Sequence, residues 1–220
     1  LSSIAFLSSF YTYSQSKDSL FTKFNELGNK LYSKPINYLN NSKTINEYKK
    51  LFTGTNLESF YLQLSSSFYA ASGNQFEAKK KYWLSKGKNI DSARVISNDL
   101  SSYNDIYSIT KDQRIIMINE NHYFPEHRVF TTSLLDSLFK QGFKYLALED
   151  LANSKTSINT REVLFESDGY YINEVMYAEM VRKAKKIGFK LISYDNNDAW
   201  NISERDSLGA MELKKVFNKK

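Results

Sequence analysis

The sequence predicts an α/β fold, with a parallel sheet and flanking helices over residues ~112–217, preceded by an all-helical N-terminal segment. Two observations predict this. Apolar residues recur at helical spacing from Asp18 to about Gly87, and after Asp99 short apolar runs of strand length alternate with amphipathic stretches. An alternating order of strands and helices implies parallel strands joined by right-handed crossovers. We expect three regions along the 220 residues, namely residues 1–15, 16–100 and 101–220.

Residues 1–15 resemble the later part of a secretory signal peptide. The first ten residues are largely apolar, and Thr12 and Ser14 place small residues at −3 and −1 if cleavage precedes Gln15. The alternative is that this stretch forms the first turns of an amphipathic helix. Under the signal-peptide interpretation, the protein is exported to the periplasm or the cell exterior. The chain has no cysteine, which excludes disulfides, cysteine-bound metals and a cysteine nucleophile.

The region of residues 16–100 is expected to contain three or four helices. Its apolar residues at helical spacing include Leu27, Leu31, Phe52 and Phe68. One hypothesis is that this region contacts other proteins. Clusters of turn residues predict breaks between its helices at residues 33–35, 40–42, 53–56 and 72–74.

Residues after Asp99 are expected to form the sheet and the helices that cover it. Residues 114–119 (RIIMIN) form a continuous apolar run, which is typical of a strand buried on both faces. Asn173 is suited to the N-cap of a helix, and Gly142 and Gly188 are suited to helix ends. The predicted elements are strands at residues 114–119, 143–148 and 189–194, and helices at residues 125–141, 173–187 and 203–217.

The formal charge of +6 arises entirely from the first part of the chain. Residues 1–100 hold 13 basic and 7 acidic residues, whereas residues 101–220 hold 17 of each. The excess consists mainly of scattered lysines, which is typical of a solvated helical face and predicts no nucleic-acid partner. No apolar run reaches the about 18 residues of a membrane-spanning helix, so we expect no transmembrane segment. Neither a Gly-rich phosphate loop nor a Gly-x-Ser-x-Gly motif is present.

Acidic residues follow each of the three predicted strands. Glu120 and His122 follow the first strand, Glu149 and Asp150 the second, and Asp195 the third. Ligands bind outside the carboxyl ends of parallel strands, so these side chains are expected at one edge. Carboxylates that converge beside an imidazole predict either a bound divalent metal or a carboxyl group of raised pKa. The alternative is that they are solvated turn residues or helix caps.

Several short motifs occur in an order that resembles a known superfamily. They are Ile118 to Tyr123 (INENHY), Leu148-Glu149, Gly169 to Glu174 (GYYINE), Arg182, Tyr194-Asp195 and Arg205-Asp206. Over residues ~112–217 this arrangement resembles the superfamily of erythromycin esterase-like proteins, ChaN-like haem-binding lipoproteins and Tiki-type metalloproteases. The resemblance implies that Glu120, His122 and Glu149 line the active centre. It also implies that Arg182 or Arg205 is the partner of an anion or a transition state.

Two departures from the family pattern bear on the function. Asn119 occupies the position where the family usually has glycine, and the family's second Gly-x-x-His motif does not occur before Lys220. Three strands alone would also leave a sheet edge uncovered, so we expect further chain beyond Lys220. Either the chain ends before its catalytic centre is complete, or the protein is a non-catalytic relative.

The leading hypothesis is an exported hydrolase-like protein, of the esterase or metallopeptidase type, that acts on a small-molecule or peptide substrate. Glu120 and His122 would activate water, directly or through a divalent metal bound by Glu120, His122 and Glu149. Glu149 would assist as an acid, a base or a ligand. The alternative is a ChaN-like protein that binds haem or iron without catalysis. Its flat ligand would stack on the aromatic residues near the site, namely Tyr123, Phe124, Tyr170 and Tyr171.

Overall fold

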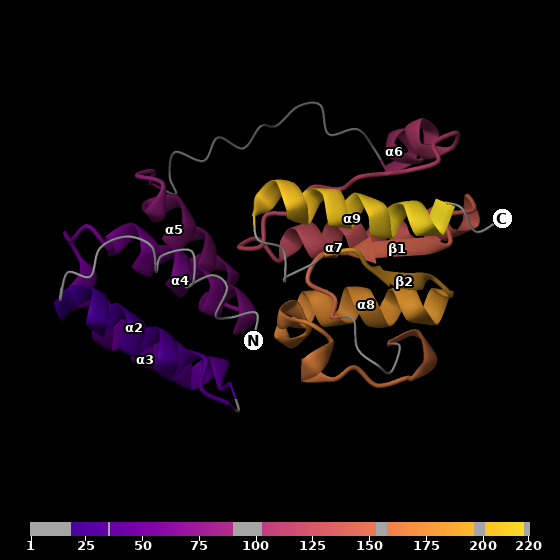
Figure 1. The fold of residues 1–220 in the computed structure, drawn as a ribbon. Helices are drawn as coiled ribbons and strands as arrows, with labels where there is room; N and C mark the ends of the chain where they lie inside the picture. Colours follow the sequence, from indigo (N-terminus) through magenta and orange to yellow (C-terminus); the bar gives the residue numbers. More distant parts are fainter. Residues whose placement is uncertain (1–18, 35, 90–102, 153–157, 196–200, 218–220) are drawn as a thin grey trace. The chain divides into compact units, whose positions relative to one another are not determined.

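The computed structural model describes residues 19–34, 36–89, 103–152, 158–195 and 201–217. The chain divides into two units, which are described separately (Figure 1). The helical unit consists of residues 1–97 and 121–125, and the sheet unit consists of residues 98–120 and 126–220. The predicted signal-peptide segment, residues 1–15, lies outside the described residues.

The helical unit contains four described helices, which confirms the prediction of three or four. They are α2 (Ser19–Leu31), α3 (Tyr38–Phe52), α4 (Glu58–Ala71) and α5 (Gln75–Ser85). The apolar stripes of these helices form one core, because each helix alone would leave its stripe in water. The buried members of this core are Leu27, Leu31, Ile45, Phe52, Tyr61, Phe68, Tyr69, Ala70 and Ala78.

The break predicted at residues 40–42 is wrong, because these residues lie inside α3. Two asparagines explain the error. Asn37 is the N-cap, and its side chain accepts a 3.0 Å hydrogen bond from the backbone N–H of Asn40. The buried Asn41 side chain donates to the carbonyl oxygen of Leu31 at 2.7 Å. Residues typical of turns therefore start the helix and tie it to the end of α2.

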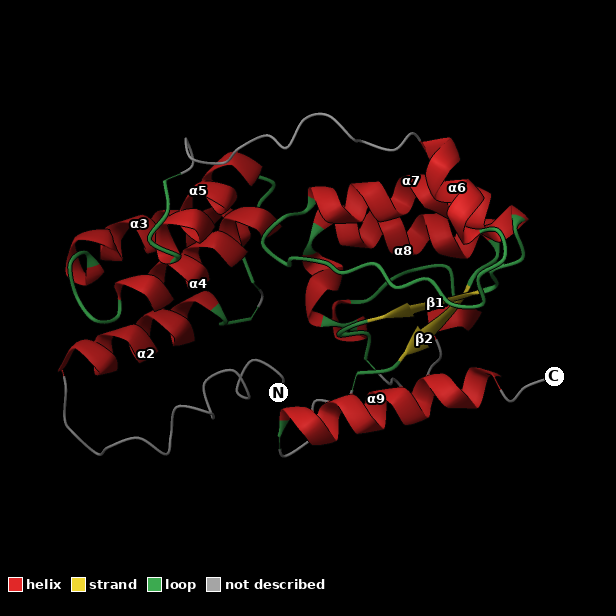
Figure 2. Cartoon of the chain, turned by 90° about the horizontal axis from the view of Figure 1, so that it is seen from above, coloured by secondary structure: helices red, strands yellow, loops and turns green. Residues whose placement is uncertain are grey.

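The sheet unit is mostly helical and contains a two-stranded parallel sheet. Strands β1 (Tyr145–Leu148) and β2 (Lys190–Ser193) pair in parallel, with Tyr145 opposite Lys190 and Leu148 opposite Ser193. The connection between them includes α8 (Val175–Ile187) as the crossover helix. Figure 2 shows α7 (Glu126–Lys140) and α8 on one side of the strands and α9 (Ile202–Phe217) on the other. The unit also contains α6 (Tyr103–Thr110) and the short 3₁₀ helices η2 (Ile158–Thr160), η3 (Glu166–Asp168) and η4 (Tyr170–Asn173).

The strand predicted at residues 114–119 is not formed. This segment has no strand assignment and pairs with neither β1 nor β2. Its side chains alternate, since Ile116 and Ile118 pack against the core whereas Ile115 is 58% and Met117 is 86% exposed. The prediction assumed that both faces were buried, but only one face packs against the unit. The parallel sheet with flanking helices is thus reduced to two short strands among helices.

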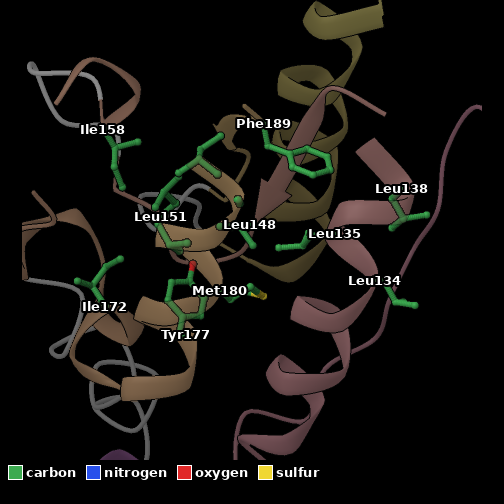
Figure 3. Packing of buried hydrophobic residues seen from close by; sticks show 13 residues of the cluster. Leu134, Leu135, Leu138, Leu148, Leu151, Ile158, Ile172, Tyr177, Met180 and Phe189 are labelled. Atoms are coloured by element: carbon green, nitrogen blue, oxygen red, sulfur yellow. The ribbon is translucent and has the colours of Figure 1, made fainter. Parts of the chain in front are cut away.

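The core of the sheet unit lies between α7, α8 and the two strands (Figure 3). Gly188 ends α8 in the left-handed conformation, with φ of +111°, and its N–H donates to the carbonyl oxygens of Ala184 and Lys185. A Cβ at Gly188 would lie 3.1 Å from the Phe139 ring, so α8 ends close against α7. The buried residues of this core are Leu134, Leu135, Leu138, Leu148, Leu151, Ile158, Ile172, Tyr177, Met180, Val181, Ala184, Phe189 and Leu191.

Among the described helices, none combines the length and the apolar character that crossing a membrane requires.

Gly169 holds the turn after β1 in place. It forms an antiparallel bridge with Leu151, its φ is +157°, and a Cβ there would overlap the carbonyl oxygen of Asp150. We expect Gly169→Ala to lower the free energy of unfolding by about 3 kcal/mol, because backbone strain and overlap act together. Gly142→Ala is the matched control, since φ there is +104° but no atom lies within 4 Å of the added Cβ. The control should cost about 1 kcal/mol. Equal losses for both variants in urea denaturation would contradict the proposed overlap with Asp150.

Candidate functional site

The candidate site lies at the carboxyl ends of the two parallel strands. Glu149 and Asp150 directly follow β1, and Tyr194 and Asp195 follow β2. Because the strands are parallel and in register, their carboxyl ends meet at one edge, where ligands bind in open parallel sheets. Two arginines from the flanking helices reach this part of the unit and pair with its carboxylates.

Arg205 of α9 joins the acidic residues that follow the two strands. Its Nε and Nη2 donate to the two carboxylate oxygens of Asp195 at 2.5 and 2.7 Å, and Nη2 also donates to Glu149 Oε1 at 2.6 Å. The hydrogen bonds from Arg205 to Asp195 are the largest cause of a raised pKa of Arg205. The Glu149 and Arg205 side chains are 35% and 41% exposed, so this pair is open to solvent.

Two local features of α9 allow Arg205 to reach the strands. The Asn201 side chain accepts a 2.9 Å hydrogen bond from the backbone N–H of Glu204, so it acts as the N-cap. Gly209 permits close approach, because a Cβ there would lie 3.2 Å from the carbonyl oxygen of Tyr194. The first half of α9 therefore lies close to Tyr194 and Asp195, which follow β2.

Arg128 of α7 is a second, buried centre of charge with a side chain only 1% exposed. Its Nε and Nη2 donate to Glu120 Oε1 at 2.9 and 2.7 Å, and its Nη1 donates to Glu174 Oε2 at 2.7 Å. The guanidinium carbon lies 4.7 Å and 5.4 Å from the ring centroids of Tyr171 and Tyr177. Burial alone would lower the pKa of Arg128, but Glu120 and Glu174 outweigh it, so the pKa is raised.

Glu174 has a second role as the N-cap of α8. Its carboxylate accepts hydrogen bonds from the backbone N–H groups of Met176 and Tyr177 at 2.8 and 2.7 Å. The N-cap predicted at Asn173 is therefore displaced by one residue. A carboxylate at this position also interacts favourably with the helix dipole. Glu174 thus connects the start of α8 to Arg128, and through Arg128 to Glu120.

Two tyrosines lie between these charges. The Tyr177 hydroxyl donates to the carbonyl oxygen of Glu149 at 2.9 Å, and burial strongly raises the pKa of Tyr177. The pKa of Tyr194 is also raised, first by burial and then by Glu149 and Asp195, with a smaller contribution from Glu120. Glu120 and Glu149 therefore lie close enough for their charges to act on the same phenol.

Asp150 is the most unusual carboxyl group of the edge. Among the described residues other than glycine, Asp150 alone has a positive φ, +60°. Its Oδ2 accepts a 3.0 Å hydrogen bond from the backbone N–H of Tyr171. Burial raises the pKa of Asp150, and the charges of Asp195 and Glu149 add to this effect against the hydrogen bonds from the Tyr171 and Tyr170 backbone. Backbone strain and a raised pKa together are typical of functional carboxyl groups.

The structure brings together three of the five predicted catalytic residues, Glu120, Glu149 and Arg205. Arg182 lies elsewhere, on an exposed part of α8 where it pairs with Glu179. His122 belongs to residues 121–125, which group with the helical unit. In that unit the neighbouring rings of Tyr123 and Phe124 contact Tyr82 and Trp83.

Arg128 and Glu174 were not predicted as site residues. Arg128 is only one of many charged residues near a helix start, and its partners are 8 and 46 residues away in the sequence. No local pattern indicates Arg128, because the residues one turn ahead on its helix face are Thr131 and Thr132. Its burial and its partners are visible only in the structure.

The predicted metal ligands do not form a metal site within the described part of the chain. No group of three or more histidine or acidic residues is placed there to share a cation. Glu120 and Glu149 instead each accept hydrogen bonds from an arginine, Arg128 and Arg205 respectively. Of the aromatic residues suggested for haem, Tyr123 and Phe124 belong to the helical unit, while Tyr171 of the sheet unit packs on Arg128. Metal and haem binding therefore stay predictions from the resemblance.

Comparison of the chain with family models, curated proteins and solved structures gives no match.

We expect Arg128→Met to lower the free energy of unfolding by about 3–5 kcal/mol, because it leaves two carboxylates without their common partner. Glu174 is only 5% exposed and cannot be rehydrated without moving the start of α8. Arg182→Met is the matched control, since Arg182 forms an exposed pair with Glu179. The control should change stability by less than about 1 kcal/mol. Urea denaturation would contradict this role if the two variants were equally stable.

Asp150→Asn tests the raised pKa of Asp150. A carboxyl group whose pKa is raised by folding makes the protein less stable as the pH rises above its ordinary value of 3.8. Asparagine has no such titration and still accepts the hydrogen bond from Tyr171. We expect the variant to exceed the wild type in stability at pH 7, with the difference shrinking as the pH falls toward 3.8. A difference that does not vary with pH in urea denaturation would contradict the raised pKa.

Proposed function

We propose that the sheet unit is a hydrolase-like domain of the erythromycin esterase or Tiki type, whose catalytic centre is the carboxyl edge of β1 and β2. In this proposal Glu120 and Glu149 act as general bases that accept a proton from an attacking water. Arg205 stabilises negative charge on the substrate. The protein would be exported, and its substrate would be a small ester or a peptide. The observation that supports this most is the pair of solvent-accessible glutamates, each held by its own arginine.

The positions of the two glutamates suit general acid–base chemistry. A catalytic base must be held in one orientation and must still be reached by water and substrate. Arg128 fixes Glu120, whose side chain is 21% exposed, and Arg205 fixes Glu149. Because Arg128 is buried, it serves to position Glu120, whereas the more exposed Arg205 is available to a substrate as well as to Glu149.

Asp150 fits the part of a proton donor in the same reaction. Hydrolysis of an ester or amide needs one group to accept a proton from water and another to protonate the leaving group. The pKa of Asp150 is raised by burial and by the neighbouring carboxylates, which favours its protonated form. In this proposal the acid, Asp150, directly follows the base, Glu149, after the end of β1.

The test is a comparison of Glu120→Gln and Glu149→Gln with the wild type on a panel of activated esters and peptide anilides. Both substitutions keep the size of the side chain but remove its basicity. We expect each to reduce kcat/KM by about 100-fold or more, as is usual for the loss of a catalytic acid or base. Glu179→Gln, at an exposed pair on α8, is the control and should retain full activity.

Two results would contradict the proposal. One is the absence of hydrolysis by the wild type on every substrate, with and without added divalent cations. The other is equal activity of the wild type and both glutamine variants. Thermal denaturation of each variant shows whether a loss of activity is due to unfolding.

A further inference from the structure

The helical unit contains a cavity that the proposed hydrolase site does not use. It has a volume of about 860 Å³ and lies among α3, α4 and α5. Cavities of roughly 300–1,000 Å³ are typical of sites for small organic molecules. Its lining combines two tyrosines, Tyr61 and Tyr69, with three lysines, Lys49, Lys80 and Lys81.

Lys81 is the most unusual residue of this lining. It is only 6% exposed, whereas lysines are almost never buried unless they are paired. Across the part of the chain that the structure describes, its ammonium makes no hydrogen bond and no ion pair. Its nitrogen is not among the fully buried polar atoms without a partner, and Lys81 lines the cavity. A buried cation therefore faces the cavity without a partner.

The other charged groups of the cavity do not supply this partner. Glu58 accepts a 2.9 Å hydrogen bond from the backbone N–H of Gly54, and Glu77 Oε1 lies 3.9 Å from Lys80 Nζ. The pKa of Lys81 is lowered, chiefly by burial; the charges of Lys49 and Lys80 lower it further, while Glu77 opposes them. Three ammonium groups thus act on one another across a cavity that holds two carboxylates.

The hydroxyl protons of the two tyrosines are already donated within the protein. The Tyr61 hydroxyl donates to the carbonyl oxygen of Ile45 at 2.8 Å, and the Tyr69 hydroxyl donates to Asn46 Oδ1 at 3.1 Å. Burial raises the pKa of Tyr61 to about 12, so this phenol stays neutral and does not repel an anion. Recognition of charge therefore falls to the lysines of the lining.

We propose that this cavity binds a small organic anion whose charged group pairs with Lys81 and whose body packs against Tyr61 and Tyr69. The charged group is a carboxylate or a phosphate monoester, since both accept hydrogen bonds from an ammonium. Binding supplies the missing partner of Lys81 and reduces the repulsion from Lys49 and Lys80. This site is independent of the hydrolase proposal, because all of its residues belong to the helical unit.

The experiment is calorimetric titration of the full chain at low ionic strength with phenyl phosphate, benzoate and the neutral phenol. We expect at least one anion to bind the wild type more tightly than phenol, and the tighter anion identifies the charged group. Lys81→Met keeps the length of the side chain and removes its charge. It should weaken anion binding by about tenfold or more, as expected for the loss of one charge-assisted hydrogen bond. Lys50→Met, at an exposed position of α3 outside the cavity, should bind like the wild type.

Thermal denaturation without ligand provides a second readout. Removing an unpaired buried charge should leave the Tm of Lys81→Met no lower than that of the wild type. Lys80→Met is a second variant for the same test and should also weaken anion binding. The proposal is overturned if neither anion binds at concentrations up to about 10 mM. It is equally overturned if phenol binds as tightly as the anions, or if Lys81→Met binds like the wild type.

Discussion

The sheet unit depends on the ion pairs that the buried guanidinium of Arg128 forms with Glu120 and Glu174. A charge with 1% exposure is tolerated in a protein interior only when it is paired and hydrogen-bonded. Arg128 meets this requirement with Glu120 on one side and Glu174 on the other. It therefore connects three segments, namely the chain that precedes α7, α7 itself and the start of α8.

The two arginines of the candidate site, Arg128 and Arg205, differ in what they can contribute to catalysis. Arg128 is enclosed by the rings of Tyr171 and Tyr177, so it can orient Glu120 but is not itself open to a ligand. Arg205 is 41% exposed and binds Glu149 and Asp195 at the surface. The buried pair supplies rigidity, and the exposed pair supplies a charged surface. A catalytic edge needs both, because its carboxylates must be held in a fixed orientation and must also be reached by the substrate.

The helices of this chain could be predicted from sequence because their signals are local. Apolar spacing located α4 and α8, and Gly188 marked the end of α8 as expected. Residues 114–119 were assigned to a strand because the run is apolar, yet a strand also needs a hydrogen-bonding partner, which the sequence does not reveal. Glu149 and Arg205 were predicted from strand ends and from a resemblance. Arg128 was missed because burial and distant partners define its role.

The excess of positive charge in the first part of the chain likewise shows what composition cannot predict, namely which charged residues become buried. Scattered lysines predict a solvated helical face, and this holds for exposed residues such as Lys50. The prediction does not hold for Lys81, which is only 6% exposed. The packing of α3, α4 and α5 places this residue beside a cavity. The sequence shows three consecutive lysines from Lys79 to Lys81 and does not distinguish the third. The structure does, because consecutive residues of a helix point in different directions around the axis, and Lys81 is the buried one. A net charge therefore gives only the excess of cations over anions in a unit, and the fold shows which cation lacks a partner.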